Sequence, residues 1–209
     1  MSERDSLKKS DRDIHVAIPA MAESGYLPDT LNCLQNQSVK PAVVWVCINH
    51  PEDYRDNSEK KQVVEDNLRT LIWLESNKRS FGFPIEFIDR CSPGKGWSGK
   101  RHGVGIARKT LMDKIAGKAQ PLDIILSLDA DTLFGESYLE SVLNSFCNYP
   151  EAVGLANPYF HKLTGDDTLD RSMLRYEIYM RHYAINMWRI GSEYSYTALG
   201  SAIATPVWA

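Results

Sequence analysis

Short apolar segments alternate with stretches of helical periodicity from residue 14 to residue 128, and this alternation limits the fold more than any other feature of the sequence. The apolar segments have the length and the valine, isoleucine and leucine content of buried strands, and they are residues 14–18, 42–48, 84–88 and 122–128. The helical stretches between them are residues 27–37, 63–72 and 104–115. Strands that alternate with helices predict an α/β fold with a mostly parallel sheet and right-handed crossovers.

Amphipathic spacing indicates which residues of the second helical stretch face the core. The expected apolar face consists of Val63, Val64, Leu68, Leu71 and Ile72. Further along, we expect a helix at 138–146, an extended segment at 152–155 and a long aromatic and basic helix at 168–189. The sequence shows no repeat and no second domain, so we expect a polar tail over 1–13 and one domain over 14–209.

Composition and charge are those of a globular protein. The chain has 209 residues, 43% hydrophobic and 24% charged, with a net charge of −3, which argues against nucleic acid bound through bulk charge. Its four cysteines have no metal-ligand spacing, and the first thirteen residues carry eight charges where a signal peptide would be apolar. The longest apolar run is seven residues, against about 20 for a membrane span, so we expect a cytoplasmic chain.

Two carboxylates, Asp129 and Asp131, follow the fourth apolar segment with only Ala130 between them. A divalent cation relieves the repulsion between two such groups, and Mg²⁺ and Mn²⁺ prefer oxygen ligands and leave positions for phosphate. The pair therefore predicts a metal-diphosphate site. Two alternatives remain open: Asp131 caps the next helix, or Asp129 is the nucleophile of a phosphohydrolase, although Leu133 stands where that pattern has Thr or Val.

A basic, glycine-rich stretch precedes this pair. Seven basic residues and one acid lie between Lys95 and Lys118, and the glycines at 94, 96, 99, 103 and 105 leave backbone amides accessible to an anion near a helix N-terminus. We expect Lys95, Lys100, Arg101 and Arg108 to contact such an anion. For Lys109, Lys114 and Lys118 a solvated basic helix face is an open alternative. Trp97 is expected either to stack on a base or sugar or to anchor the loop.

Three segments together resemble the family 2 glycosyltransferases of the GT-A fold. These are IHVAIPAMAESGYLPDTLNCLQNQ (14–37), RHGVGIARK (101–109) and IILSLDAD (124–131). The resemblance implies a Rossmann-like, mostly parallel sheet flanked by helices, the nucleotide-diphospho-sugar transferase fold. It implies transfer of a sugar from a UDP- or GDP-type donor to a saccharide or lipid-linked acceptor, with inversion and with Mn²⁺ or Mg²⁺. It also implies a role in making cell-envelope polysaccharide, and peripheral association with the inner face of a membrane.

The resemblance also assigns roles to residues. The expected donor-nucleotide contacts are Pro19, Ala20, Glu23, Asn49, Lys95, Arg101, Arg108 and Asp129. Asp129 and Asp131 would hold the metal. Trp97, Gly200 and Ser201 would lie at the sugar and acceptor. The family's acidic turn after the second strand is replaced here by Asn49-His50-Pro51-Glu52-Asp53, and Asn49 is expected to take over the contact with the base.

The family's general base lies in a Glu-Asp pair downstream of the small-residue segment at 196–204, and the sequence ends at Ala209 without such a pair. We therefore expect a C-terminally truncated form that lacks its base. The alternative is a non-catalytic nucleotide-binding remnant. A sugar-phosphate nucleotidyltransferase is disfavoured, because residues 19–23 do not form its glycine-rich loop.

Overall fold

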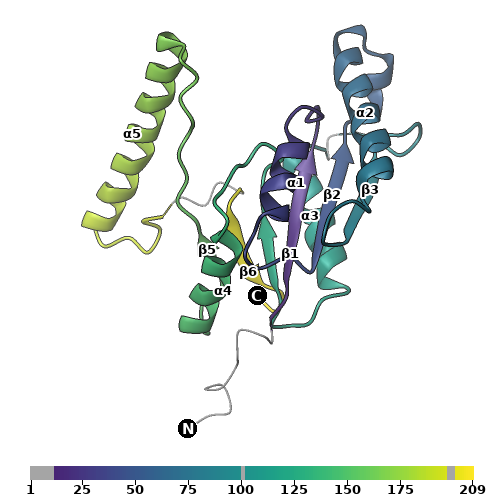
Figure 1. Cartoon of the computed structure of the whole chain (residues 1–209). Coiled ribbons are helices and arrows are strands. Elements are labelled where there is room, and N and C mark those ends of the chain that lie inside the picture. Colours follow the sequence, from purple (N-terminus) through teal and green to yellow (C-terminus); the bar gives the residue numbers. More distant parts are fainter. Residues whose placement is uncertain (1–11, 100–101, 197–200) are drawn as a thin grey trace.

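The sheet of this protein is mostly parallel. The computed structural model describes residues 12–99, 102–196 and 201–209, and in this part of the chain six strands pair in the order β3-β2-β1-β4-β6-β5 (Figure 1). β1 pairs in parallel with β2 and β4, and β2 with β3, whereas β6 is antiparallel to both β4 and β5. The strands are β1 (Ile14–Ala20), β2 (Val43–Asn49), β3 (Ile85–Arg90), β4 (Ile124–Ser127), β5 (Leu155–Ala156) and β6 (Ile203–Pro206). The predicted α/β class is confirmed.

Helices connect the strands where helical periodicity predicts them. The α-helices are α1 (Leu27–Gln35), α2 (Lys61–Asn77), α3 (Val104–Ala116), α4 (Tyr138–Asn148) and α5 (Asp167–Arg189). Two short 3-10 helices, η3 (Glu52–Asp56) and η4 (Ser58–Lys60), lie between β2 and α2. None of the helices in the described ranges combines the length and the apolar character needed to cross a bilayer.

The sheet has an apolar core on each face, because side chains alternate along its strands. Val16 and Ile18 of β1 belong to a cluster that also contains Leu31 of α1 and Phe146 of α4. Ala17, between them, belongs to a second cluster with residues of α3. The helices therefore form layers on both faces, with α1 and α4 on one side and α3 on the other.

The predicted apolar face of α2 is wrong in part. Leu68 and Ile72 are exposed, whereas Asn67, Thr70 and Leu74 are buried. The inward face is turned toward polar backbone at the ends of β1 and β2, and the Asn67 side chain bonds to both of those segments. Tertiary hydrogen bonds thus override the apolar spacing of this helix.

α5 stands apart from the layered part of the chain (Figure 1). None of its residues belongs to either core cluster, and one side chain, Glu177, is buried, under His161 of the preceding segment. The Asp166 carboxylate caps its N-terminus by accepting hydrogen bonds from the amides of Thr168 and Leu169. The chain then returns to the sheet as β6.

The order of the strands reverses direction beside β1. β2 and β3 are added on one side of β1, and β4 is added on the other side. In open α/β sheets, ligands bind outside the carboxyl ends of the strands at such a reversal. Here the segments at this position are residues 21–24 after β1 and residues 128–132 after β4.

Candidate functional site

The turn after β4 holds its two carboxylates outward. Ala130, between them, is buried, and its carbonyl accepts a 2.6 Å hydrogen bond from the Thr30 hydroxyl of α1. The same hydroxyl lies 3.2 Å from the carbonyl oxygen of Thr132. Thr30 is fully buried, so this turn is fixed from inside the protein while Asp129 and Asp131 reach the surface. A small residue is needed between the two acids because that position is packed.

Two predicted site residues contact Asp129 directly. The Arg108 guanidinium, carried by α3, forms an ion pair with the Asp129 carboxylate. The Asp129 amide donates a 2.9 Å hydrogen bond to the Ser201 hydroxyl. Arg108 is 16% exposed and Asp129 is 41% exposed, so the pair lies at the boundary between protein and solvent. Together with Thr30 of α1, three segments distant in sequence therefore contact the acidic turn.

Arg108 has a hydrogen-bond donor that is not used within the described structure. Among the residues that the structure describes, the Arg108 Nε is buried and has no hydrogen-bond partner. A buried donor without an acceptor is costly, and a bound anion would supply one. Arg108 thus combines a fixed carboxylate partner with an unused N–H group.

Glu23 lies near both aspartates. Partial burial, together with the negative charges of Asp131, Asp129 and Asp66, raises the pKa of its carboxyl group from 4.5 to about 7. A cation would reverse this effect, because it favours the ionised form of every carboxylate beside it. Glu23 is therefore the third acid at the carboxyl ends of β1 and β4.

The segment that carries Glu23 is held by α2. The Ala22 amide donates to Asn67 Oδ1 at 2.9 Å, and Asn67 Nδ2 donates to the Asn49 carbonyl at 2.9 Å. Ser24 donates to the Asp66 carboxylate through its amide, at 2.9 Å, and through its hydroxyl, at 2.5 Å. Neither α2 residue follows a strand or belongs to a recognised motif, so only their polar character could have marked them in the sequence.

The predicted contact between Asn49 and a base is not supported. Asn49 is 3% exposed, and its Nδ2 donates to the carbonyls of Ala20 and Cys47. Its side chain therefore joins the ends of β1 and β2. Pro19 and Ala20, predicted to line the nucleotide pocket, are likewise buried within β1, because the strand extends through both.

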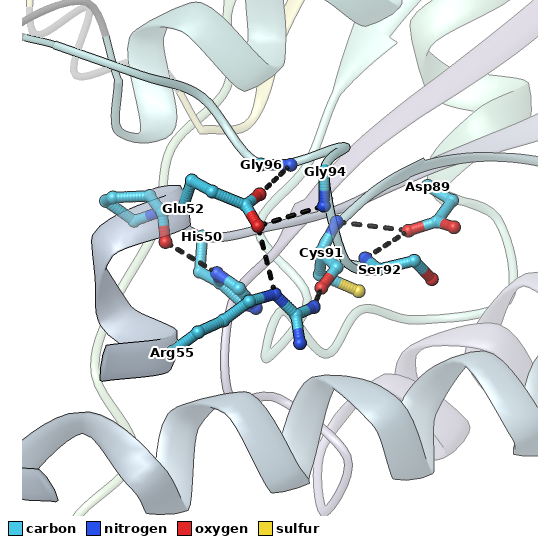
Figure 2. A network of polar contacts seen from close by, with 9 residues as sticks. His50, Glu52, Arg55, Asp89, Cys91, Ser92, Gly94 and Gly96 are labelled. Carbon is cyan, nitrogen blue, oxygen red and sulfur yellow. Dashed lines mark hydrogen bonds and ion pairs between the residues drawn. The ribbon is translucent and has the colours of Figure 1, made fainter. Parts of the chain in front are cut away.

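The prediction that glycine amides after β3 are accessible to a bound anion is wrong at two positions. The amides of Gly94 and Gly96 donate to the two oxygens of the Glu52 carboxylate, at 2.9 and 2.7 Å (Figure 2). The protein fills this anion-binding position with its own side chain. The sequence pattern could not show this, because Glu52 is more than 40 residues away.

Lys95 and Trp97 also have protein partners in this segment. Lys95 forms a 2.8 Å ion pair with Asp89. Burial alone would raise the pKa of Asp89, but the bonds from Lys95 and from the Ser92 and Cys91 amides outweigh burial and lower it. Trp97 is partly buried and packs against the α3-side cluster, which is the anchoring alternative rather than an exposed stacking surface. Lys100, Arg101 and Gly200, the remaining predicted contacts, lie outside the described residues.

The acidic side chains fit a divalent cation that a ligand helps to hold. Within the described ranges, no group of three or more His, Cys, Asp or Glu residues is arranged to hold a metal by itself. Mg²⁺, however, is commonly bound by one or two carboxylates together with substrate phosphates and water. Asp129 and Asp131 on a fixed turn, with Glu23 under acidic repulsion beside them, match that second type of site.

Comparison with known proteins gave structural matches. No protein-family model and no curated protein sequence matches the chain. TarS 1–349 of S. aureus superposes with a TM-score of 0.44 and 16% identity over 73% of this chain and 39% of that one. TarS 1–349 in complex with UDP-GlcNAc gives 0.43 and 17%, over 73% and 36%. Glucosyl-3-phosphoglycerate synthase from Mycobacterium tuberculosis in complex with UDP gives 0.49 and 13%, over 95% and 58%. The chain thus spans less than two thirds of each.

Proposed function

We propose that this chain binds the donor of a glycosyltransferase, a nucleoside-diphosphate sugar of the UDP or GDP type, with Mn²⁺ or Mg²⁺. One observation carries the proposal: the Asp129-Ala130-Asp131 turn lies at the reversal of strand order between β1 and β4, with Arg108 and Glu23 directed to it. This is the edge at which α/β sheets bind nucleotides.

Residues in and around the acidic turn would have different roles in binding the diphosphate. Asp129 and Asp131 would hold a divalent cation, which when bound stabilises the negative charge of a departing nucleoside diphosphate. Thr30 and Ser201 fix the backbone from which the two carboxylates project. Because these bonds hold the backbone of the turn, its carboxylates would need little rearrangement to bind the cation.

Arg108 would contribute the protein's own positive charge. Its guanidinium is anchored on Asp129, and its buried Nε–H has no acceptor in the described structure. A phosphate oxygen at that position would complete its hydrogen bonding, and charge-assisted bonds of this kind are among the stronger ones in proteins. Arg108 therefore favours a diphosphate over an uncharged ligand at this edge.

Isothermal titration calorimetry with UDP and with GDP, each in the presence of Mn²⁺, tests the proposal. The intact chain is expected to bind one of them, and Asp129→Ala and Asp131→Ala are expected to weaken binding by about tenfold or more, the effect of removing a charged ligand contact. Asp113→Ala is the matched control, since Asp113 is exposed on α3 and pairs with Lys109 at the surface. The assignment fails if neither nucleotide binds, or if the Asp129 and Asp131 variants bind as the control does.

A further inference from the structure

The loop after β3 surrounds a carboxylate that comes from the first residue of η3, shortly after β2. Residues 91–97, here called the glycine segment, present the amides of Gly94 and Gly96 toward Glu52, and each amide bonds a different oxygen of that carboxylate (Figure 2). Successive backbone amides that converge on one point form an anion-binding concavity of the kind that cradles phosphate. In this protein Glu52 supplies the anion.

Arg55 completes the charge balance of this arrangement. Its Nε lies 3.3 Å from Glu52, and its guanidinium also donates to the carbonyl of Cys91, at the start of the glycine segment. The hydrogen bond from the Gly94 amide, with those from the Gly96 amide and the charge of Arg55, lowers the pKa of Glu52. Glu52 is therefore ionised at neutral pH, and three side-chain hydrogen bonds join η3 to the glycine segment.

The backbones of the two segments are also in direct contact. The Glu52 amide donates to the Trp97 carbonyl at 3.0 Å, and Pro51 pairs with Trp97 in a parallel bridge. A Cβ atom on Gly96 would lie 2.5 Å from the Glu52 carboxylate and 2.9 Å from its Cα, so only glycine fits here. At Gly96 the glycine segment and η3 are therefore in close contact through both the backbone and the carboxylate of Glu52.

This position matters for the acidic turn through α3. Trp97 packs against the core cluster that contains Ala107 and Leu111 of α3, and Arg108 of the same helix reaches Asp129. The glycine segment also follows β3, whose carboxyl end lies at the same edge of the parallel sheet as those of β1 and β4. A shift of the glycine segment would therefore move α3 and change the position of Arg108 at the proposed nucleotide site.

We propose that Glu52 is a positioning residue for the nucleotide site: its carboxylate takes the place of a ligand anion and holds the glycine segment against the end of β2. The donor diphosphate is then bound by the acidic turn and Arg108 and not by the glycine amides. This inference rests on the proposed function for its consequence, but the link between Glu52 and the glycine segment can be tested without any nucleotide.

Amide hydrogen exchange in protein labelled with ¹⁵N-glycine tests that link directly. In Glu52→Ala and Glu52→Gln the amides of Gly94 and Gly96 are expected to exchange about tenfold faster or more, because a bond to a charged acceptor is lost or weakened. Asp53→Ala is the matched control, an exposed acid on the same turn of η3. If both amides exchange equally in the Glu52 variants and the control, Glu52 does not hold the segment.

Rescue by a small anion separates positioning from a merely structural loss. Glu52→Ala leaves the amide pair and Arg55 in place without their carboxylate, and acetate has the chemistry of the missing group. We expect the variant to bind UDP or GDP with Mn²⁺ about tenfold more weakly than wild type, and acetate to restore much of that affinity, with no effect of acetate on Asp53→Ala.

The possible results are distinguishable. Faster exchange together with unchanged nucleotide affinity would overturn the positioning role, because the segment would be released without consequence for the site. Weaker binding that acetate does not restore would overturn the claim that the carboxylate acts as an anion in the amide concavity. If wild type binds neither nucleotide, the proposed function and the positioning role both fail, while the exchange rates still decide whether Glu52 holds the segment.

Discussion

Arg108 and Asp129 are the two residues on which the proposed site depends most at the scale of single side chains. The Arg108 guanidinium faces a carboxylate on one side and has a buried, unpartnered Nε in the described structure on the other. Arg108→Met removes the ion pair and the unpartnered N–H group while keeping an aliphatic side chain. We expect the affinity for UDP or GDP with Mn²⁺ to fall by about tenfold to a hundredfold, measured by calorimetry.

Lysine at the same position gives an intermediate case. Arg108→Lys keeps the charge but loses the planar, multiple donors, so its affinity should lie between that of wild type and that of Arg108→Met. Lys109→Met is the control, because Lys109 is exposed and pairs with Asp113 on the surface of α3. Nucleotide affinity equal to wild type in Arg108→Met would remove Arg108 from the site.

Glu23 makes the stability of the protein depend on pH. Its pKa is raised from 4.5 to about 7, so the folded protein holds a proton that the unfolded chain has lost between these values. The contribution of Glu23 to the free energy of unfolding is therefore fully present below pH 4.5 and is lost as the pH rises through 7. Urea denaturation at pH 5 and pH 8 should show that Glu23→Gln flattens this decline, whereas Glu59→Gln, at an exposed position, leaves it unchanged.

Several of the side chains that meet at the acidic turn could be predicted from the sequence. Asp129, Asp131 and Glu23 follow strands of a parallel sheet, and Arg108 belongs to a segment with family resemblance, so position along the chain was enough. Thr30 and Glu52 could not be predicted. Their partners are 100 and 42 to 44 residues away, and a hydroxyl or a carboxylate on a loop or helix carries no mark of such a partner.

Among the secondary-structure elements, α2 shows how a polar face can position a binding edge. Asn67 is 1% exposed and bonds the backbone after β1 and at the end of β2. Apolar periodicity placed Leu71 correctly against the core but also placed Leu68 and Ile72 there, because that pattern contains no information about polar backbone that needs a partner. The element was predictable in extent and type, but in orientation only in part.

Replacing Asn67 tests the role of this face. Asn67→Ala leaves the Ala22 amide and the buried Asn49 carbonyl without their side-chain partner, and a buried polar group that loses its partner costs about 1–3 kcal/mol. We expect urea denaturation to show a loss of about 2 kcal/mol or more in the free energy of unfolding. Gln62→Ala, at an exposed position on the same helix, is the control. A loss no larger than that of the control would show that these bonds are not made in solution.

The glycine segment gives a second test at the scale of elements. Gly96→Ala places a Cβ atom against the backbone and carboxylate of Glu52, so it should separate η3 from the segment and increase the exchange of the Gly94 amide. Gly105→Ala, in the first turn of α3, meets no atom within 4 Å and should be tolerated without loss of stability. Equal tolerance of the two substitutions would contradict the close approach at Gly96.

The arrangement of the whole molecule explains why residues so far apart in sequence can form one site. The order of the sheet changes direction between β1 and β4, and the acidic turn, Glu23 and Arg108 all lie at that position. The parallel part of the sheet was predictable from alternating strands and helices. The insertion of β6 between β4 and β5 was not, because β6 returns after the long α5 and pairs antiparallel over only four residues.

The metal is expected to bind strongly only with its nucleotide, because no described group of three acidic, histidine or cysteine side chains can hold it alone. Titration of Mn²⁺, followed by its electron paramagnetic resonance signal, in the absence and presence of UDP or GDP tests this most directly. We predict that nucleotide tightens Mn²⁺ binding by about 5- to 150-fold, that Mn²⁺ tightens nucleotide binding by the same factor, and that Asp129→Ala and Asp131→Ala abolish the coupling. Equal Mn²⁺ affinity with and without nucleotide would contradict a shared metal-diphosphate site at this turn.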